Sequence, residues 1–444
     1  MRRSIEDQSG DTVWRSVLPG MLDVGFSSIA TFAVGLYAAH SLGPAEFGVY
    51  ALFTSAFIFA AVVPAFLVLF PSAFAAVSET PVGRERLNLI GQTWRLGAPT
   101  AFVAAALASL VAGLTANEPA RVVVPLALTC TVCATISPLQ DHVRRTLHMG
   151  SCSWSAMVLS LVQVSCVGIS LALLKEGRVA PPWRPFTALA IANTISFGVG
   201  LALGRKQASG SLPRYEIRTL TRSGRWLVTH HLGMAGGFFG STAVVTAVAG
   251  RTAIGQAEAA RLVAQPLYVL MSGLCAITQH LSFAAGERRD STEAHRVARI
   301  FVTLLVIGGA TFGIATARPW WGNPFPRILP AAYARPGLVT VCVVAFILHG
   351  TYAPFGAELL GAGRRRVHAL VAVSVGVIQC LAAVTAVWLG PFSRPLVLAG
   401  ASVVIAAVYL PVRRAVYRDR TAPTPTTSVD LTEPDSDVLL ATLG

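Results

Sequence analysis

The sequence predicts an all-α polytopic membrane protein with about twelve transmembrane helices. Hydrophobic residues make up 54% of the 444 residues, charged residues make up only 13%, and the mean hydropathy is +0.62. These values lie far outside the range of soluble domains. Apolar runs of about twenty residues recur from end to end, each long enough to cross roughly 30 Å of hydrocarbon as a helix. A membrane barrel would instead show short strands of alternating polarity.

The spans follow from the apolar runs in chain order. The first run is too long for a signal peptide and lacks a convincing cleavage site, so we interpret it as a retained span. Pro64 and Pro71 fall within the second run, which predicts a long or kinked helix. The predicted spans cover residues 17–39, 47–77, 96–115, 121–140, 154–174, 186–204, 226–249, 262–285, 297–316, 337–358, 367–389 and 395–412.

Basic residues form short clusters between the apolar runs, where they indicate topology. One set of alternate loops contains 25 of the 35 basic residues, and the other set contains 10. Because positive charge is retained on the cytoplasmic side, we expect both termini in the cytoplasm, as an even number of spans requires. The net charge of +14 does not indicate nucleic acid as a partner, because the basic residues form no continuous face.

The longest basic loop lies at the midpoint of the chain and predicts two halves of six spans each. With an offset of 212, Gly43, Ala45 and Glu46 match Gly255, Ala257 and Glu258, at the turn after the first span of each half. Parallel repeats of this kind occur in membrane proteins built from duplicated halves. We predict a cytoplasmic N-terminus (1–16), a first bundle (17–204), a basic cytoplasmic linker (205–225), a second bundle (226–412), and a cytoplasmic basic segment with a disordered tail (413–444).

The sequence gives no reason to expect an enzyme, a cofactor or a metal site. The seven cysteines fall inside apolar runs or beside a basic loop, so neither a disulfide framework nor a zinc site is indicated. Cys130 and Cys133 form a CxxC pattern inside a span, where packing is the better interpretation. No Gly-rich loop ending in Gly-Lys-Ser/Thr is present, so ATP hydrolysis by this chain is unsupported.

The turn after the first span carries a resemblance to a known family. Its sequence SLGPAEFGVYAL, Ser41–Leu52, resembles the LGPxEFGxYAL signature of the Wzx-type polysaccharide flippase family, within the multidrug/oligosaccharidyl-lipid/polysaccharide exporter superfamily. Physically, a Gly-Pro pair ends one helix, and a carboxylate near the start of the next helix opposes the positive end of its dipole. We therefore expect a structural role for the motif residues Gly43, Pro44, Glu46 and Gly48.

Two further segments are similar to the same family. PLQDHVRRTLHMG, Pro138–Gly150, looks like the exit of the fourth span into the cytoplasm, and GAGRRR, Gly361–Arg366, occupies the corresponding exit of the tenth span. The resemblance covers about residues 10–415. It implies two six-helix bundles around a central cavity that opens alternately to either side, in a bacterial plasma (inner) membrane.

The resemblance also implies a function and its partners. The family's activity would be that of a flippase that moves a polyprenyl-diphosphate-linked oligosaccharide, or a related cell-envelope precursor, among membrane lipids. The energy source stays open between a proton or sodium ion acting through Asp23 or Glu358 and removal of the product outside. A drug cation antiporter of the same superfamily is the nearest alternative.

An integral-membrane polymerase or glycosyltransferase acting on lipid-linked glycans is a more distant alternative. Such an enzyme needs a substantial outward loop or an acidic motif for its sugar donor. The longest outward segment, Ala317–Pro336, contains no acidic residue. The sequence therefore favours a transporter over an enzyme.

A charged, hydroxyl-rich head group crosses hydrocarbon only with polar and cationic partners from the protein. Arginine suits phosphate because its planar fork donates two hydrogen bonds. Each candidate has a plainer interpretation as an interface anchor or a packing residue, and for Gln163 and Asn193 packing is preferred. We expect Arg251 and Arg261 to have release-side or surface roles. The candidate substrate-binding residues are Arg15, Asp23, Arg225, His230, His231, His280, His349 and Glu358.

Overall fold

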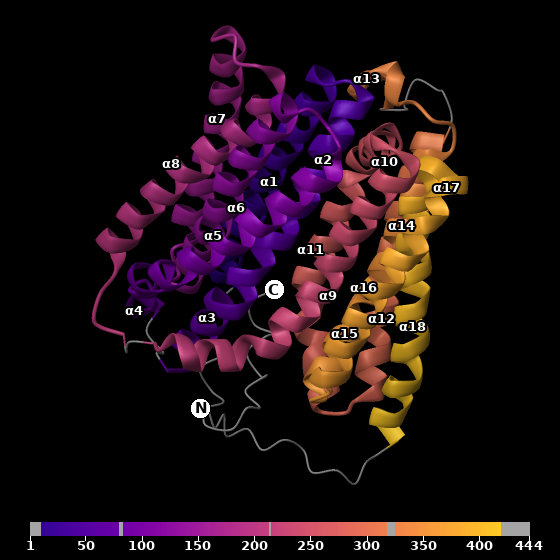
Figure 1. Cartoon of the computed structure of the whole chain (residues 1–444). Helices are drawn as coiled ribbons and strands as arrows, with labels where there is room; N and C mark the ends of the chain where they lie inside the picture. The colour runs from indigo at the N-terminus through magenta and orange to yellow at the C-terminus, as the bar shows by residue number, and fades with distance from the viewer. Residues whose placement is uncertain (1–9, 80–82, 213–214, 318–324, 419–444) are drawn as a thin grey trace.

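The computed structural model describes residues 10–79, 83–212, 215–317 and 325–418, and every regular element in these ranges is helical (Figure 1). The first half of the chain forms six successive crossings of the bundle. Its elements are α1 (Gly10–Ser41), α2 (Pro44–Pro64), η1 (Ala65–Leu69), α3 (Phe70–Glu79), α4 (Gly83–Arg86), α5 (Leu89–Ala116), α6 (Ala120–Met149), α7 (Ser153–Glu176), η2 (Pro181–Trp183) and α8 (Arg184–Gln207).

The second half repeats this plan with more breaks in its helices. Its elements are α9 (Ile217–Ala249), α10 (Arg251–Val263), α11 (Gln265–Glu287), α12 (Ser291–Ala317), α13 (Phe325–Ile328), η3 (Ala331–Tyr333), α14 (Leu338–Thr351), α15 (Ala353–Gly361), α16 (Arg365–Ala382), η4 (Ala383–Thr385), α17 (Ala386–Leu389), η5 (Gly390–Phe392) and α18 (Ser393–Arg418). The two ends of the segment predicted as a linker, 205–225, are thus helical, since α8 extends to Gln207 and α9 begins at Ile217.

Within the described ranges, ten helical stretches are long and apolar enough to cross a membrane, and a bent pair in α11 would be an eleventh. The last of the ten, Arg365–Arg418, contains both α16 and α18. Figure 1 shows the chain reversing direction at α17 between these two helices. Counting α16 and α18 as two crossings, together with the bent pair in α11, gives the twelve crossings expected from the sequence. The protein is thus an all-α membrane protein, as predicted.

The second crossing contains the irregularity that its prolines predict. A π-helical segment, η1, begins directly after Pro64 and separates α2 from α3. Proline lacks the amide hydrogen of an ordinary helical bond and crowds the preceding turn, so the backbone departs from α-helical geometry there. The apolar run nevertheless continues as a single crossing from Pro44 to Ala76.

The two halves lie side by side and contact each other mainly through α2 and η1 of the first half and α9 and α10 of the second. In Figure 1 the first half, indigo to magenta, stands beside the second half, rose to yellow, with α2 facing α9 and α10. The segment η1 also packs on α9. We call the end where α1 begins the basic end and the end where α1 meets α2 the opposite end.

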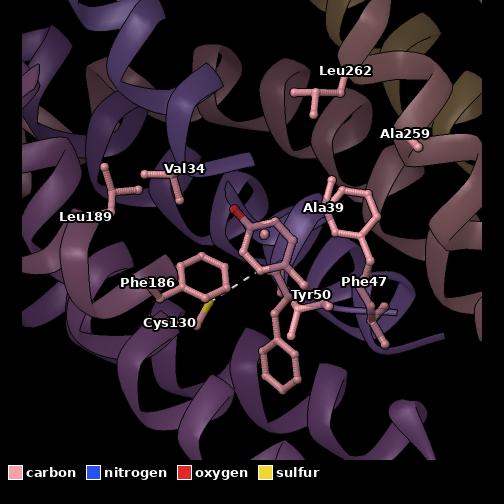
Figure 2. Packing of buried hydrophobic residues seen from close by; sticks show 14 of the residues in the cluster. Val34, Ala39, Phe47, Tyr50, Cys130, Phe186, Leu189, Ala259 and Leu262 are labelled. Carbon is pink, nitrogen blue, oxygen red and sulfur yellow. Dashed lines mark hydrogen bonds between the residues drawn. The ribbon is translucent and has the colours of Figure 1, made fainter. Parts of the chain in front are cut away.

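A continuous apolar core crosses the junction near the opposite end. Figure 2 shows Phe47 and Tyr50 of α2 packed between Phe186 of α8 and the side chains of α10, among them Leu262. The large apolar side chains that stay exposed, such as Leu107, lie on outer helical faces. In a membrane these faces contact lipid, so the interior need not be more apolar than the surface.

Candidate functional site

Asp23 lies inside the first half, enclosed by three helices. Its side chain is buried, Ser160 donates a hydrogen bond to Oδ1 at 2.5 Å, and His148 Nε2 lies 2.9 Å from Oδ2. Arg144 Nε is 3.7 Å from the same carboxylate. The cluster therefore joins α1 to α6 and α7, and the positive charge of Arg144 compensates part of the carboxylate charge.

Glu358 is a buried carboxylate of the second half, on α15 (Ala353–Gly361). It is 2% exposed and pairs with Arg413 of α18, while the hydroxyl of Tyr417 donates to its Oε2 at 3.2 Å. Arg413 Nη1 also lies 3.3 Å from His295 Nε2. This cluster joins α15, α12 and α18 near the basic end. Its substrate-binding role stays a prediction.

A third buried carboxylate belongs to the repeated Gly-x-Ala-Glu turn of the second half. Glu258 is 4% exposed, and both of its oxygens accept hydrogen bonds from Arg261 Nε at 2.9 Å. Arg394 Nη1 donates to Oε2 at 2.7 Å. The matching residue Glu46 is exposed and instead accepts a hydrogen bond from the Gly43 amide at 3.3 Å. The repeat therefore preserves the glutamate but changes its partners.

The sequence predicts release-side or surface roles for Arg261 and assigns no role to Arg394. In the structure both guanidinium groups pair with the carboxylate of Glu258. The one sequence feature that indicates this pairing is the spacing of Glu258 and Arg261 by about one helical turn.

Three histidines form a cluster at the junction between the halves, in which the rings of His230 and His231 meet edge to face. The ring of His231 lies 3.5 Å from that of Phe66 in η1, measured between centroids, and the rings of His230 and His368 stack at 3.8 Å. His368 Nδ1 shares a 2.6 Å hydrogen bond with the hydroxyl of Tyr409. The predicted pair His230 and His231 therefore lies at the junction, and His368 joins it from α16.

The remaining candidates do not converge with these clusters. Arg225 is exposed and lies over the ring of Trp226 at 5.6 Å, and His280 is exposed on α11. His349 lies inside the second half, with Ser402 3.4 Å from its Nδ1. The side chain of Arg15 lies outside the described part of the structure. The seven candidates whose side chains are described therefore lie in separate places, and their role in binding a substrate stays a prediction.

The predicted packing pair behaves as expected from its burial. Gln163 Nε2 donates to Asn193 Oδ1 at 2.6 Å, and both residues are buried inside the first half. This hydrogen bond joins α7 to α8 inside the first half. Gln163 Oε1 and Asn193 Nδ2 are buried and make no hydrogen bond among the described residues.

The family-motif turn brings the halves into backbone contact at the opposite end. Gly43 is the N-cap of α2 and Pro44 its first residue. A Cβ built at Gly48 would lie well under 3.0 Å from the carbonyl oxygen of Arg251, and a Cβ at Gly255 equally close to that of Pro44. The two repeated turns therefore cross each other with no room for a side chain, which only glycine permits.

Polar contacts close the same end of the junction. Arg251 pairs with Glu118 and donates to the Asn117 carbonyl at 3.1 Å, which joins α10 to the loop after α5. The buried hydroxyl of Tyr333 donates to the Leu42 carbonyl at 2.7 Å, which joins η3 to the end of α1. We call these two contacts the outer ties. Opening this end requires both of them to break.

Replacing Tyr333 with phenylalanine is expected to loosen this closure. The change removes a buried hydrogen bond and leaves the Leu42 carbonyl without its donor, a loss of about 1 kcal/mol. That energy corresponds to roughly a fivefold shift from the closed toward the open form. Spin labels on Arg121→Cys and Ala332→Cys, both exposed at this end, in a chain without its native cysteines, would report the change as a larger population of long distances. An unchanged distance distribution would show that the tie does not hold the halves.

Comparison with known proteins identifies the fold. No protein-family model and no curated protein sequence matches the chain. A solved structure described as the inward-facing conformation of a multidrug resistance MATE family transporter of the MOP superfamily has a TM-score of 0.69 and 14% identity, covering 89% of this chain and 96% of that chain. The outward-facing conformation of such a transporter has a TM-score of 0.58 and 14% identity, covering 91% and 95%.

A third solved structure differs in the character of its pocket. It is a MOP superfamily transporter from Pyrococcus furiosus, described as having a binding pocket of reverse polarity that suggests a different function; its TM-score is 0.58 and its identity 13%, covering 90% of this chain and 94% of that chain. The predicted fold of two six-helix bundles is thereby confirmed as that of MATE transporters. The narrower resemblance to Wzx-type flippases stays a prediction.

Proposed function

We propose that this chain is a membrane transporter that moves its substrate by alternating access between its two halves. The observation that carries the proposal is the closure of the opposite end, where two repeated turns meet through Gly48 and Gly255 and the outer ties bridge the halves. Each contact joins one half to the other, so all of them break together when the halves separate. The better superposition on an inward-facing transporter, 0.69 against 0.58, agrees with this closure.

The ion pairs of the buried carboxylates indicate which charge the substrate carries. Among the described residues, Asp23, Glu258 and Glu358 are the buried acidic side chains, and each lies against at least one arginine. A carboxylate that is already paired offers little attraction to a cationic drug, because its charge is compensated. This arrangement favours a neutral or anionic amphiphile as the substrate.

The comparisons favour a small molecule as the cargo. Two of the similar solved structures are described as multidrug resistance transporters, whereas a lipid-linked saccharide rests on the resemblance of three short segments, Ser41–Leu52, Pro138–Gly150 and Gly361–Arg366. We therefore propose a small neutral or anionic amphiphile first. The polyprenyl-diphosphate-linked saccharide is a second candidate, because its diphosphate meets the same charge requirement.

A depletion experiment separates these candidates. We would measure polyprenyl-diphosphate saccharides by mass spectrometry in membranes of a strain depleted of the protein, beside a complemented strain. Accumulation of one completed lipid-linked unit, reversed by complementation, identifies the saccharide as cargo. No accumulation together with altered sensitivity to amphiphilic drugs identifies the small molecule. Accumulation of a shortened glycan would overturn the transporter proposal in favour of an enzyme.

A further inference from the structure

Two helices of the second half, α9 and α16, pack against each other and begin at the basic end (Figure 1). Close to both starts lies Trp226, whose ring is contacted by two guanidinium groups. Cζ of Arg225 lies 5.6 Å from the centre of the ring, and Cζ of Arg366 lies 5.7 Å from it. Arg225 belongs to α9 and Arg366 to α16, so a single aromatic side chain holds cations of both helices together.

These two arginines have no anionic partner in the described part of the chain. Both are exposed, and neither takes part in an ion pair there. The helices α9 and α16 themselves contain no acidic residue. Two like charges beside one ring repel each other, and a bound anion relieves this repulsion.

Arg366 lies at the start of an exposed apolar stripe on α16. The residues of the stripe follow Arg366 at intervals of three or four positions, and their exposed fractions lie between 38% and 68%. They are Leu370, Val373, Val377 and Leu381. Residues at this spacing share one face of a helix. In a membrane this face contacts acyl chains, so the head group of a lipid lying along it reaches the level of Arg366.

A general preference for positive charge on the cytoplasmic side accounts less well for this arrangement. That preference explains single arginines at the membrane boundary, but it does not require two of them, from different helices, on one ring. Arg288 and Arg296 are also exposed at this end, and each has an acidic residue within three positions in the sequence. Tryptophan is also enriched at the level of lipid head groups.

We propose that Trp226, Arg225 and Arg366, which together we call the Trp226 site, bind the head group of an anionic phospholipid. The two guanidinium groups meet the negative charge, and each can donate two hydrogen bonds to a phosphate. An acyl chain of the same lipid follows the apolar stripe of α16. A head group that also carries an ammonium is less favoured, because the arginines repel it. The proposal concerns a lipid ligand and does not depend on the identity of the transported substrate.

The test is the lipid preference of the purified full chain, measured by native mass spectrometry. The chain is incubated with equal amounts of phosphatidylglycerol and phosphatidylcholine, and the retained lipids are counted. Each arginine beside an anionic head group gives roughly a fivefold gain in affinity, so we expect a preference for phosphatidylglycerol of roughly tenfold or more. Equal retention of the two lipids overturns the proposal. Displacement of phosphatidylglycerol by an equal concentration of inorganic phosphate also overturns it, because the lipid is held by its acyl chain as well.

A double variant, Arg225→Gln with Arg366→Gln, locates the effect. Both positions are exposed, so the variant is expected to fold, and it should retain the two lipids about equally. The matched control, Arg296→Gln with Arg299→Gln, removes two charges from exposed positions near the start of α12, where Ile300 is also exposed. The control should keep the preference of the parent chain.

Two other outcomes would assign the binding elsewhere. Equal losses of the preference in both double variants would show a diffuse attraction of lipid to the basic end, which overturns the Trp226 site. The segment 419–444 contains five acidic residues and one arginine, so it is the competing occupant within this chain. A preference for phosphatidylglycerol that appears only after removal of this segment would make the segment the occupant and overturn the lipid proposal.

Discussion

Replacing Gly48 with alanine is expected to hold the opposite end open. The added Cβ would occupy the position of the Arg251 carbonyl oxygen, so α2 and α10 must move apart. Overpacking of a tight contact costs about 1–3 kcal/mol, and each 1.4 kcal/mol is a factor of ten. The closed population should therefore fall by roughly ten- to a hundredfold. The same change at Gly255, which faces Pro44, should act in the same direction.

The measurement uses the spin labels at positions 121 and 332, which need no knowledge of the substrate. Long distances should dominate in Gly48→Ala and in Gly255→Ala. The matched control is Gly168→Ala, at an exposed helical glycine with open space around it, where alanine should stabilise the helix by up to about 1 kcal/mol. If short distances between the two spin labels still dominate in Gly48→Ala, the two turns can separate without opening this end.

Replacing Glu358 with glutamine is expected to give the largest loss of stability among single changes at the basic end. The neutral amide leaves Arg413 buried without its counter-charge and weakens the acceptor used by Tyr417. Removing one partner of a buried ion pair costs about 3–5 kcal/mol. The unfolding temperature in nanodiscs should therefore fall markedly in Glu358→Gln.

A double change separates ion-pair loss from a packing defect. Glu358→Leu with Arg413→Met removes both charges, and such replacements are often neutral, so most of the lost stability should return. The control Glu176→Gln changes an exposed carboxylate at the end of α7 and should stay within about 0.5 kcal/mol of the parent. Equal losses in the single and double variants would show that the charge pair is not the cause.

The sequence predicted the fold because lipid imposes a simple rule on composition. Long apolar runs had to be helices, and all twelve predicted spans coincide with helices of the structure. The eighth predicted span, 262–285, coincides with α11 but leaves out the helix before it, α10, which carries three charged residues. Hydropathy assigns such a charged segment to a loop. In the structure Glu258 and Arg261 pair with each other, Glu258 also pairs with Arg394, and Arg251 pairs with Glu118.

The site was harder to predict than the fold, because its contacts join residues that are distant in the sequence. An intramembrane carboxylate at position 23 is visible in the sequence, but its partner His148 lies 125 positions away. From the sequence alone, a residue that faces the substrate path between the halves cannot be distinguished from a residue that is buried within one half. His368 is not among the candidate substrate-binding residues predicted from the sequence, because it lies just after the three arginines 364–366, whose cluster indicates topology.

The divergence of Glu46 and Glu258 bears on how this molecule arose and how it can be rebuilt. The two glycine turns still interlock, so ancestral duplication would have given both copies the same joint. In the second copy, arginines pair with the buried glutamate, whereas in the first copy the exposed glutamate accepts a hydrogen bond from the Gly43 amide. A fusion of two first halves should therefore retain the joint between the glycine turns yet lack the ion pairs of Glu258 with Arg261 and Arg394. The two halves are thus no longer interchangeable.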